Sequence, residues 1–220
     1  MLEPSLAGET RVLFSETMTI ELHQADLPQS HPFSGAVAID TETLGLNPKR
    51  DRLCLVQLSS GDGIAHLVKF AAGAYEAPEL KALLKDQSVL KIFHFARFDI
   101  ATLYQHLGVL AAPVYCTKIA SKLTRTYTDR HGLKDICRDL LNVDLSKQQQ
   151  SSDWAAETLS QDQLNYAASD VLYLHRLKEE LDIRLARENR LDLAQACFDF
   201  LPIRARLDLA GWPDTDIFAH

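Results

Sequence analysis

Apolar residues in the first half of the chain recur in short runs rich in Val, Ile and Leu, a pattern typical of β-strands. These runs cover residues 19–23, 36–39, 52–59, 64–70 and 89–95. Short turns join the second, third and fourth runs, and Ser60-Gly61-Asp62-Gly63 is a hairpin signal between the last two of these. The pattern therefore predicts five strands, three of which form an antiparallel meander.

From residue 78 onward most apolar positions follow the spacing of amphipathic helices. Helices are predicted over residues 78–86, 99–107, 117–126, 132–141, 160–188 and 191–205. Ser160 followed by Gln163 matches a capping box, so we expect a helix to begin there. Strands come first, then strand–helix units, then helices. This order predicts an α/β fold with a mixed five-stranded sheet flanked by helices.

Composition and charge narrow the classes of function. The 220 residues are 46% apolar and 24% charged, which supports one domain with a sizeable core and excludes a disordered chain. The net charge of −7 lacks the basic excess of proteins that grip long duplexes, so a nucleic-acid substrate would be short or held locally. We expect residues 1–18 to be an N-terminal extension, 19–205 the functional domain and 206–220 a C-terminal tail.

The cysteines and the absence of long apolar runs indicate the cellular compartment in which the protein is expected. The four cysteines lie far apart without a C-x-x-C pair, which is typical of reduced, mostly buried thiols. No apolar run approaches the ~20 residues of a membrane span, and the N-terminus lacks a signal-peptide pattern. We therefore expect a soluble, cytoplasmic protein that does not bind membranes.

Two acidic residues follow the buried strand at 36–39. Asp40 and Glu42 are two residues apart, so in a strand their side chains project from the same face. Two carboxylates that close repel each other unless a positive group lies between them, and hard ions such as Mg²⁺ or Mn²⁺ suit such ligands. Taken alone, the pair is also compatible with a solvated acidic turn.

Three further residues complete an acidic constellation. Asp99 follows the strand at 89–95, where a lone Asp would otherwise be a helix N-cap. Tyr166 and Asp170 are four residues apart on a predicted helix and share one face. If the four acids meet, they fit a hydrolase with two divalent metal ions about 3.5–4 Å apart, which clamp the attacking and leaving oxygens of a phosphoryl displacement.

Each of these residues then has an expected role. We expect Asp40 to bridge the two ions, Glu42 and Asp170 to complete one metal site, and Asp99 to help hold the other. Tyr166 would position or deprotonate the attacking water, although its unperturbed pKa near 10 requires help from a nearby metal.

These motifs resemble those of the DEDD exonucleases of the tyrosine subtype. The stretches LSKQQQSSDWAAETL at 145–159 and LNYAASDVLYL at 164–174 are similar to ribonuclease D. TKIASKLTRTYTDRHG at 117–132 and the C-terminal residues 198–220 resemble bacterial nano-RNase C. The resemblance covers about residues 19–205, and all five proposed catalytic positions match the family pattern.

The resemblance implies a ribonuclease H-like fold and a 3′→5′ exoribonuclease that uses two divalent ions, Mg²⁺ or Mn²⁺. It further implies that the substrate is very short RNA, above all dinucleotides, and that the chain forms a homo-octamer, with the tail at 206–220 as a subunit contact. Two alternatives stay open: a broader exonuclease acting on longer RNA or DNA ends, and a catalytically inactive nucleic-acid-binding scaffold.

Some residues near the acids are candidates for binding the substrate. In related oligoribonucleases a leucine in this turn wedges between the two bases, which assigns that role to Leu46 beside Leu44, with a core leucine as the alternative. Thr43 would contact the 3′-terminal sugar and His94 the 3′ end, while Phe98 would stack on a base, unless the last two are ordinary core residues.

A basic cluster is the remaining candidate. Lys118, Lys122 and Arg125 fall at i, i+4 and i+7 of a predicted helix, which places them on one face. A solvated face is the ordinary explanation, but in an acidic chain we expect Lys122 and Arg125 to meet a substrate phosphate or another subunit.

Overall fold

A six-stranded mixed sheet forms the centre of the computed structural model, which describes residues 18–31, 33–146 and 148–219. The strand order is β1-β4-β3-β2-β5-β6. The strands are β1 (Thr19–Gln24), β2 (Ala36–Thr43), β3 (Leu53–Ser59), β4 (Ile64–Lys69), β5 (Leu90–Phe93) and β6 (Val114–Cys116). The expected extension at 1–18 lies, except for Met18, outside the described residues.

The pairing confirms the predicted meander and corrects the number of strands. β2 with β3 and β3 with β4 are antiparallel, whereas β1 joins β4, β5 joins β2 and β6 joins β5 in parallel. The expectation of five strands was wrong because β6 has only three residues, too few to display a periodic pattern. All seven residues of β3 are buried, as expected for a strand covered on both faces.

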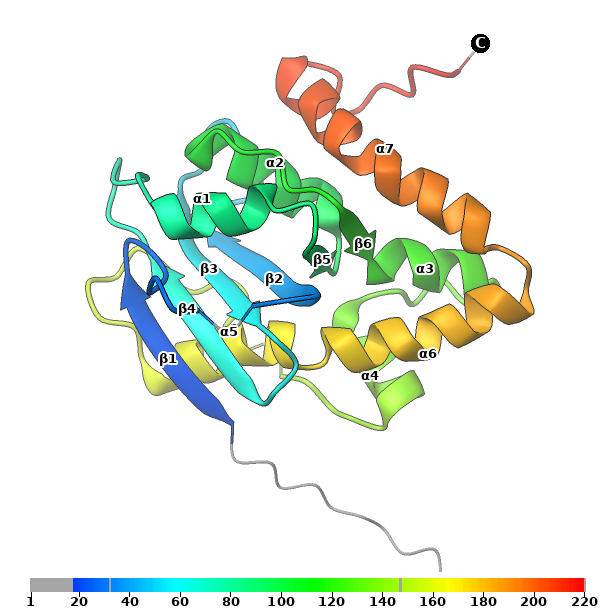
Figure 1. Cartoon of the computed structure of the whole chain (residues 1–220), viewed down its shortest axis with the longest axis horizontal. Coiled ribbons are helices and arrows are strands. Elements are labelled where there is room, and N and C mark those ends of the chain that lie inside the picture. The colour runs from blue at the N-terminus through cyan, green and yellow to red at the C-terminus, as the bar shows by residue number, and fades with distance from the viewer. Residues whose placement is uncertain (1–17, 32, 147, 220) are drawn as a thin grey trace, which may run out of the picture.

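Seven helices surround the sheet in the described part of the chain. They are α1 (Pro78–Lys85), α2 (Ala96–Leu107), α3 (Thr117–Thr124), α4 (Leu133–Leu141), α5 (Gln161–Leu172), α6 (Leu174–Arg187) and α7 (Leu191–Ala210). Figure 1 shows α1 and α2 on one face of the sheet and α5 across the other, with α7 running along the outside of α2. No helix of the described residues is both long and apolar enough to cross a membrane.

Several helix boundaries differ from the expectation. The segment at 160–188 is two helices that meet at Tyr173, and no Gly or Pro marks that junction in the sequence. α7 extends beyond 205 to Ala210, and α2 begins at Ala96. Asp99 therefore lies inside the first turn of α2 rather than at its N-cap. The capping box at Ser160 is confirmed, because both of its hydrogen bonds are present.

The thiols agree with the expectation of free, mostly buried cysteines. Cys54, Cys116 and Cys137 are buried and free, whereas Cys197 is free and exposed on α7. No disulfide therefore joins the described elements, and the core that supports the site is held by apolar packing.

Candidate active site

Two elements bring three carboxylates to one point. Asp40 and Glu42 project from the same face of β2, and Asp170 projects toward them from α5, which packs on that face. Their oxygen atoms lie within 4.8 Å of one another, and all three side chains are half-buried. Neighbouring residues Ala167 and Ala168 of α5 are fully buried, and their small size lets the helix approach the sheet closely.

A buried glutamine lies beside this group. Gln57 of β3 is the cross-strand partner of Asp40, and its Nε2 is 3.5 Å from an oxygen of Asp40 and 3.5 Å from an oxygen of Glu42. The side chain is fully buried, and among the described residues its Oε1 has no hydrogen-bond partner. Gln57 is therefore placed to hold both carboxylates in one orientation.

The electrostatics of the group favour a bound cation. Burial raises the pKa of Asp40 to about 7. Burial, followed by repulsion from the neighbouring carboxylates, also raises the pKa of Glu42 and of Asp170. Three hard oxygen donors that repel one another in a partly enclosed space match the ligands of Mg²⁺ or Mn²⁺, so the residues present fit a divalent ion.

Asp99 reaches the same region from α2. Its side chain is buried, and its Oδ1 accepts a hydrogen bond from Thr41 Oγ1 at 2.7 Å. Burial and then the charge of Asp40 raise the pKa of Asp99. It lies outside the compact group formed by Asp40, Glu42 and Asp170.

Tyr166 precedes Asp170 by one turn of α5. The indole ring of Trp154, itself buried, packs against the Tyr166 ring with centroids 6.0 Å apart. Burial, and then the carboxylates of Asp170, Glu42 and Asp40, raise the pKa of Tyr166. The phenol therefore carries its proton unless a cation offsets those charges.

The five residues line a cavity of about 560 Å³. At its rim Leu46 is 87% exposed and Leu44 is 49% exposed, so neither is a core residue. A hydrogen bond stabilises the turn that carries them, because Asp51 Oδ2 accepts from Asn47 N at 2.9 Å. A Cβ at Gly45 would lie 2.2 Å from the same oxygen, so this turn requires glycine.

Three of the other candidates also line the cavity, namely Thr43, His94 and Phe98. Nδ1 of His94 is 2.8 Å from Thr117 Oγ1, and its buried Nε2 has no partner among the described residues. Burial lowers the pKa of His94 to about 3, so the ring is neutral at physiological pH. A neutral ring with a free nitrogen suits a hydrogen bond to substrate.

The expected basic face is wrong at Arg125. The side chain is 1% exposed and pairs with Asp139, because α3 ends at Thr124 and the chain turns the guanidinium inward. Lys122 is exposed but lines an adjoining hollow against α7 and not the acidic cavity. Of the three basic residues, only Lys118 lines the acidic cavity.

Other residues of the site had little or no signal in the sequence. Phe95 lines the cavity, is 46% exposed and has a φ of 80°, a left-handed conformation that is rare for an aromatic residue. Lys118 Nζ lies 4.2 Å from its ring centroid. Gln57 did leave a signal, as a lone amide in the mostly apolar strand β3.

Comparisons with known proteins agree with this geometry. A family model described as "3'-5' exonuclease" matches residues 16–186. A ribonuclease D of Acidiphilium cryptum is 34% identical over 184 residues, which are 81% of this chain but 46% of that protein. The chain thus spans about half the length of the curated relatives it matches or less.

Solved structures extend the comparison. NrnC of Brucella melitensis is 64% identical with a TM-score of 0.89, and the match covers 92% of this chain and all of NrnC. NrnC structures with bound Mg²⁺ and bound to pGG are 62% and 63% identical. RNase D of Escherichia coli is 26% identical with a TM-score of 0.68, covering 79% of this chain and 45% of RNase D.

The acidic residues on β2, α2 and α5, the mixed sheet that carries them and the family match over residues 16–186 lead to one conclusion. The chain belongs to the 3′-5′ exonuclease family, in its ribonuclease D-like group.

Proposed function

We propose that this chain removes nucleotides from the 3′ end of very short RNA, especially dinucleotides, and releases nucleoside 5′-monophosphates. The observation that carries the proposal is the convergence of Asp40, Glu42 and Asp170 within 4.8 Å on the wall of a cavity whose rim holds the exposed Leu46. The solved structure of NrnC bound to pGG supports a short substrate.

The residues divide the work as follows. Asp40, Glu42 and Asp170 would hold one divalent ion, and Asp99 with Asp40 a second. When bound, two such ions supply charge stabilisation for the attacking and leaving oxygens. Tyr166, fixed by Trp154, orients the attacking water, and Gln57 keeps the two strand carboxylates aligned. Mg²⁺ is the ion in one NrnC structure, and Mn²⁺ has the same preference for oxygen ligands.

Contacts to the substrate follow from the cavity wall. Leu46, beside Leu44, would insert between the two bases, Thr43 would meet the 3′-terminal sugar, and Phe98 would stack on a base. The free nitrogen of His94 would meet the 3′-terminal nucleotide. Lys118 would meet a phosphate of the substrate rather than Lys122 or Arg125, because it is the one of the three that lines the cavity.

A length series tests the activity. Labelled RNAs of two to ten nucleotides, assayed at single turnover with Mg²⁺ and with EDTA, should show fastest hydrolysis of the dinucleotide and none in EDTA. Equal rates at all lengths would replace the dinucleotide preference by a broader exonuclease that trims RNA or DNA ends. Full activity of a folded Asp40→Asn variant would contradict the assignment of the metal site.

We also propose that the chain forms a homo-oligomer, an octamer by its resemblance to nano-RNase C, through α7 and the tail that follows it. Leu191, Leu193 and Ile203 of α7 are 44–55% exposed, and Trp212 and Phe218 of the tail are 47% and 68% exposed. Exposed apolar residues in such a group are typical of contact surfaces. Sedimentation of the wild type and of a Trp212→Ser, Phe218→Ser variant would test this, and identical masses would exclude the tail as a contact.

A further inference from the structure

A second group of metal-binding side chains lies on the edge of the sheet, away from the acidic cavity. Glu21 of β1 is the register partner of His66 of β4, and His23 follows two residues later on the same face as Glu21. Leu67 is the cross-strand partner of Gln57, so these two side chains share one face of the sheet. His66 is next to Leu67 in sequence, so its side chain points to the opposite face. This cluster is therefore separated from the proposed hydrolytic centre by the sheet itself.

The distances within the cluster match those around one metal ion. His23 Nε2 is 3.2 Å from His66 Nδ1, Glu21 Oε2 is 3.3 Å from His66 Nδ1, and Glu21 Oε2 is 3.9 Å from His23 Nε2. Ligands at the zinc–nitrogen and zinc–oxygen distances of a tetrahedral site are separated by about 3.3–3.4 Å. Small side-chain adjustments would therefore bring all three atoms to one ion.

Hydrogen bonding alone satisfies the three atoms poorly. A neutral imidazole carries one proton, so the proton that joins two of these atoms leaves a lone pair facing the third. His66 is 4% exposed, so a second proton would leave a charged ring in a nearly water-free position. A bound cation can accept a lone pair from each of the three atoms at once. With hydrogen bonds alone, two acceptor atoms face each other in a partly buried site, which is unfavourable.

The surroundings of His66 fix the direction in which its ligand atom points. Phe33 packs edge-on against the ring with centroids 5.2 Å apart, and the ring is stacked on His23 at 5.5 Å. Its other nitrogen, Nε2, is buried and has no partner among the described residues. Nδ1 is thus held toward Glu21 and His23 by packing.

We propose that Glu21, His23 and His66 form a zinc-type metal site that ties the edge strand β1 to β4. Two imidazoles and one carboxylate favour Zn²⁺ over Mg²⁺, which prefers an all-oxygen site. Three protein ligands leave a fourth position for water. Because β1 pairs only with β4 among the described strands, an ion that bridges the two stabilises this edge of the sheet.

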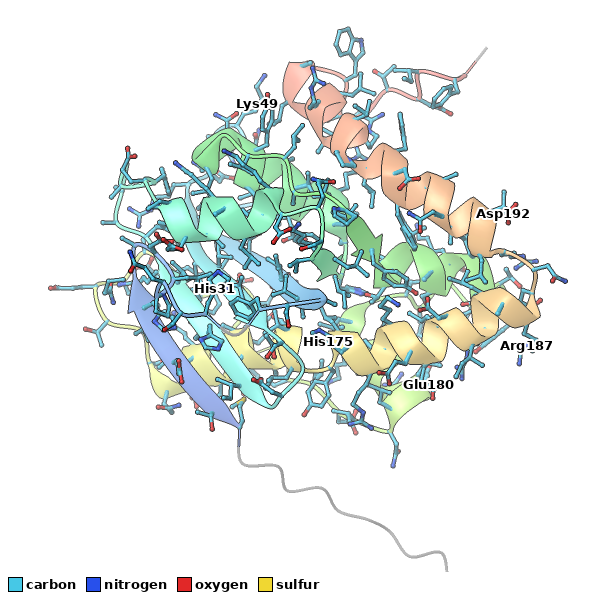
Figure 2. All side chains as sticks on the ribbon, viewed as in Figure 1. His31, Lys49, His175, Glu180, Arg187 and Asp192 are labelled. Atoms are coloured by element: carbon cyan, nitrogen blue, oxygen red, sulfur yellow. The ribbon has the colours of Figure 1, made fainter. Side chains whose placement is uncertain are left out.

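The test uses the full chain without a histidine tag, freed of metal by chelation and kept in excess Mg²⁺. Titration with Co²⁺ should give the visible absorption of a four-coordinate histidine-containing site, and Zn²⁺ should abolish it and raise the Tm by several degrees. His23→Gln and Glu21→Gln should lose the absorption and the Tm rise. Figure 2 shows the control residue His175 at the start of α6, away from β1, and His175→Gln should behave as the wild type.

Two outcomes would overturn the site. One is a wild-type chain without the Co²⁺ absorption, and the other is an unchanged absorption and an unchanged bound Zn²⁺ count in His23→Gln. Because His23 and Glu21 face away from the acidic cavity, both variants should keep their Mg²⁺-dependent turnover of a dinucleotide, which shows that they fold. Figure 2 also shows His31 near β1 and β4, and His31→Gln should keep the Co²⁺ absorption, because the fourth position is assigned to water.

Discussion

Single side chains around the carboxylates decide how well the site is ordered, and Gln57 contacts two of the carboxylates. Its one amide nitrogen faces both Asp40 and Glu42. Gln57→Met keeps the volume but removes the donor, so we expect a loss of about 10–100-fold in Mg²⁺ affinity or activity. Measuring kcat against Mg²⁺ concentration checks this. A loss that is equal at all Mg²⁺ concentrations would show that Gln57 does not act through the ligands.

Leu46 poses a different question, because its exposure costs free energy that binding would recover. Leu46→Ala should leave the Tm unchanged, since the side chain is 87% exposed. It should raise KM for a dinucleotide about 10-fold, because burying a leucine contributes about 1.5–3 kcal/mol. Ile183→Ala on α6, 64% exposed and outside the cavity lining, is the matched control. Equal KM values in the two variants would refute the wedge.

At the scale of elements, one ionic cluster ties α7 to α2. Asp208 of α7 accepts hydrogen bonds from Arg97 of α2 at 2.5 Å and from Arg204 of its own helix. Its side chain is only 12% exposed. Asp208→Asn leaves two guanidinium groups without their anion, so we expect the free energy of unfolding to fall by about 1–2 kcal/mol, less than for a fully buried pair.

Urea denaturation measures this loss, and Glu180→Gln is the control. Glu180 pairs with Arg184 at the same i,i+4 spacing on α6, but its side chain is 40% exposed, so its removal should cost less than about 0.5 kcal/mol. Equal losses in the two variants would show that the contact of α7 with α2 depends on apolar packing instead.

The elements also show how far local patterns reach. The strand alternation around β2 and the i,i+4 spacing of Tyr166 and Asp170 predict which side chains share a face, because both periodicities are local. Arg125 could not be placed this way, since its direction depends on where α3 ends. Likewise β6 is too short for a pattern, and nothing local separates α5 from α6 at Tyr173.

For the molecule as a whole, the site is where long-range arrangement outweighs local preference. β2, α2 and α5 come from distant parts of the chain, and only the fold brings their acids together. The presence of the acids was predictable from the motifs. The left-handed backbone at Phe95 was not, because it arises where β5 gives way to α2. The chain has a net charge of −7, and the fold crowds several of its carboxylates into one cavity.

That crowding makes stability depend on pH and metal together. The pKa of Asp40 is raised from 3.8 to about 7, so the folded chain binds this proton more tightly than the unfolded chain. The associated stabilisation is complete below pH 3.8 and is lost as the pH rises to about 7. Without metal, the Tm should therefore be lower at pH 8 than at pH 5.5, by about 4–8 °C if ~2 kcal/mol is involved.

Mg²⁺ replaces the proton, so it should raise the Tm more at pH 8 than at pH 5.5. Thermal unfolding at both pH values, with EDTA or Mg²⁺, measures both effects, and Asp40→Asn separates this residue from the rest of the chain. The variant has no charge to protonate there, so its Tm in EDTA should change less between the two pH values. If the Tm of the variant and that of the wild type respond alike to pH and to Mg²⁺, then Mg²⁺ does not stabilise the protein by relieving repulsion at Asp40.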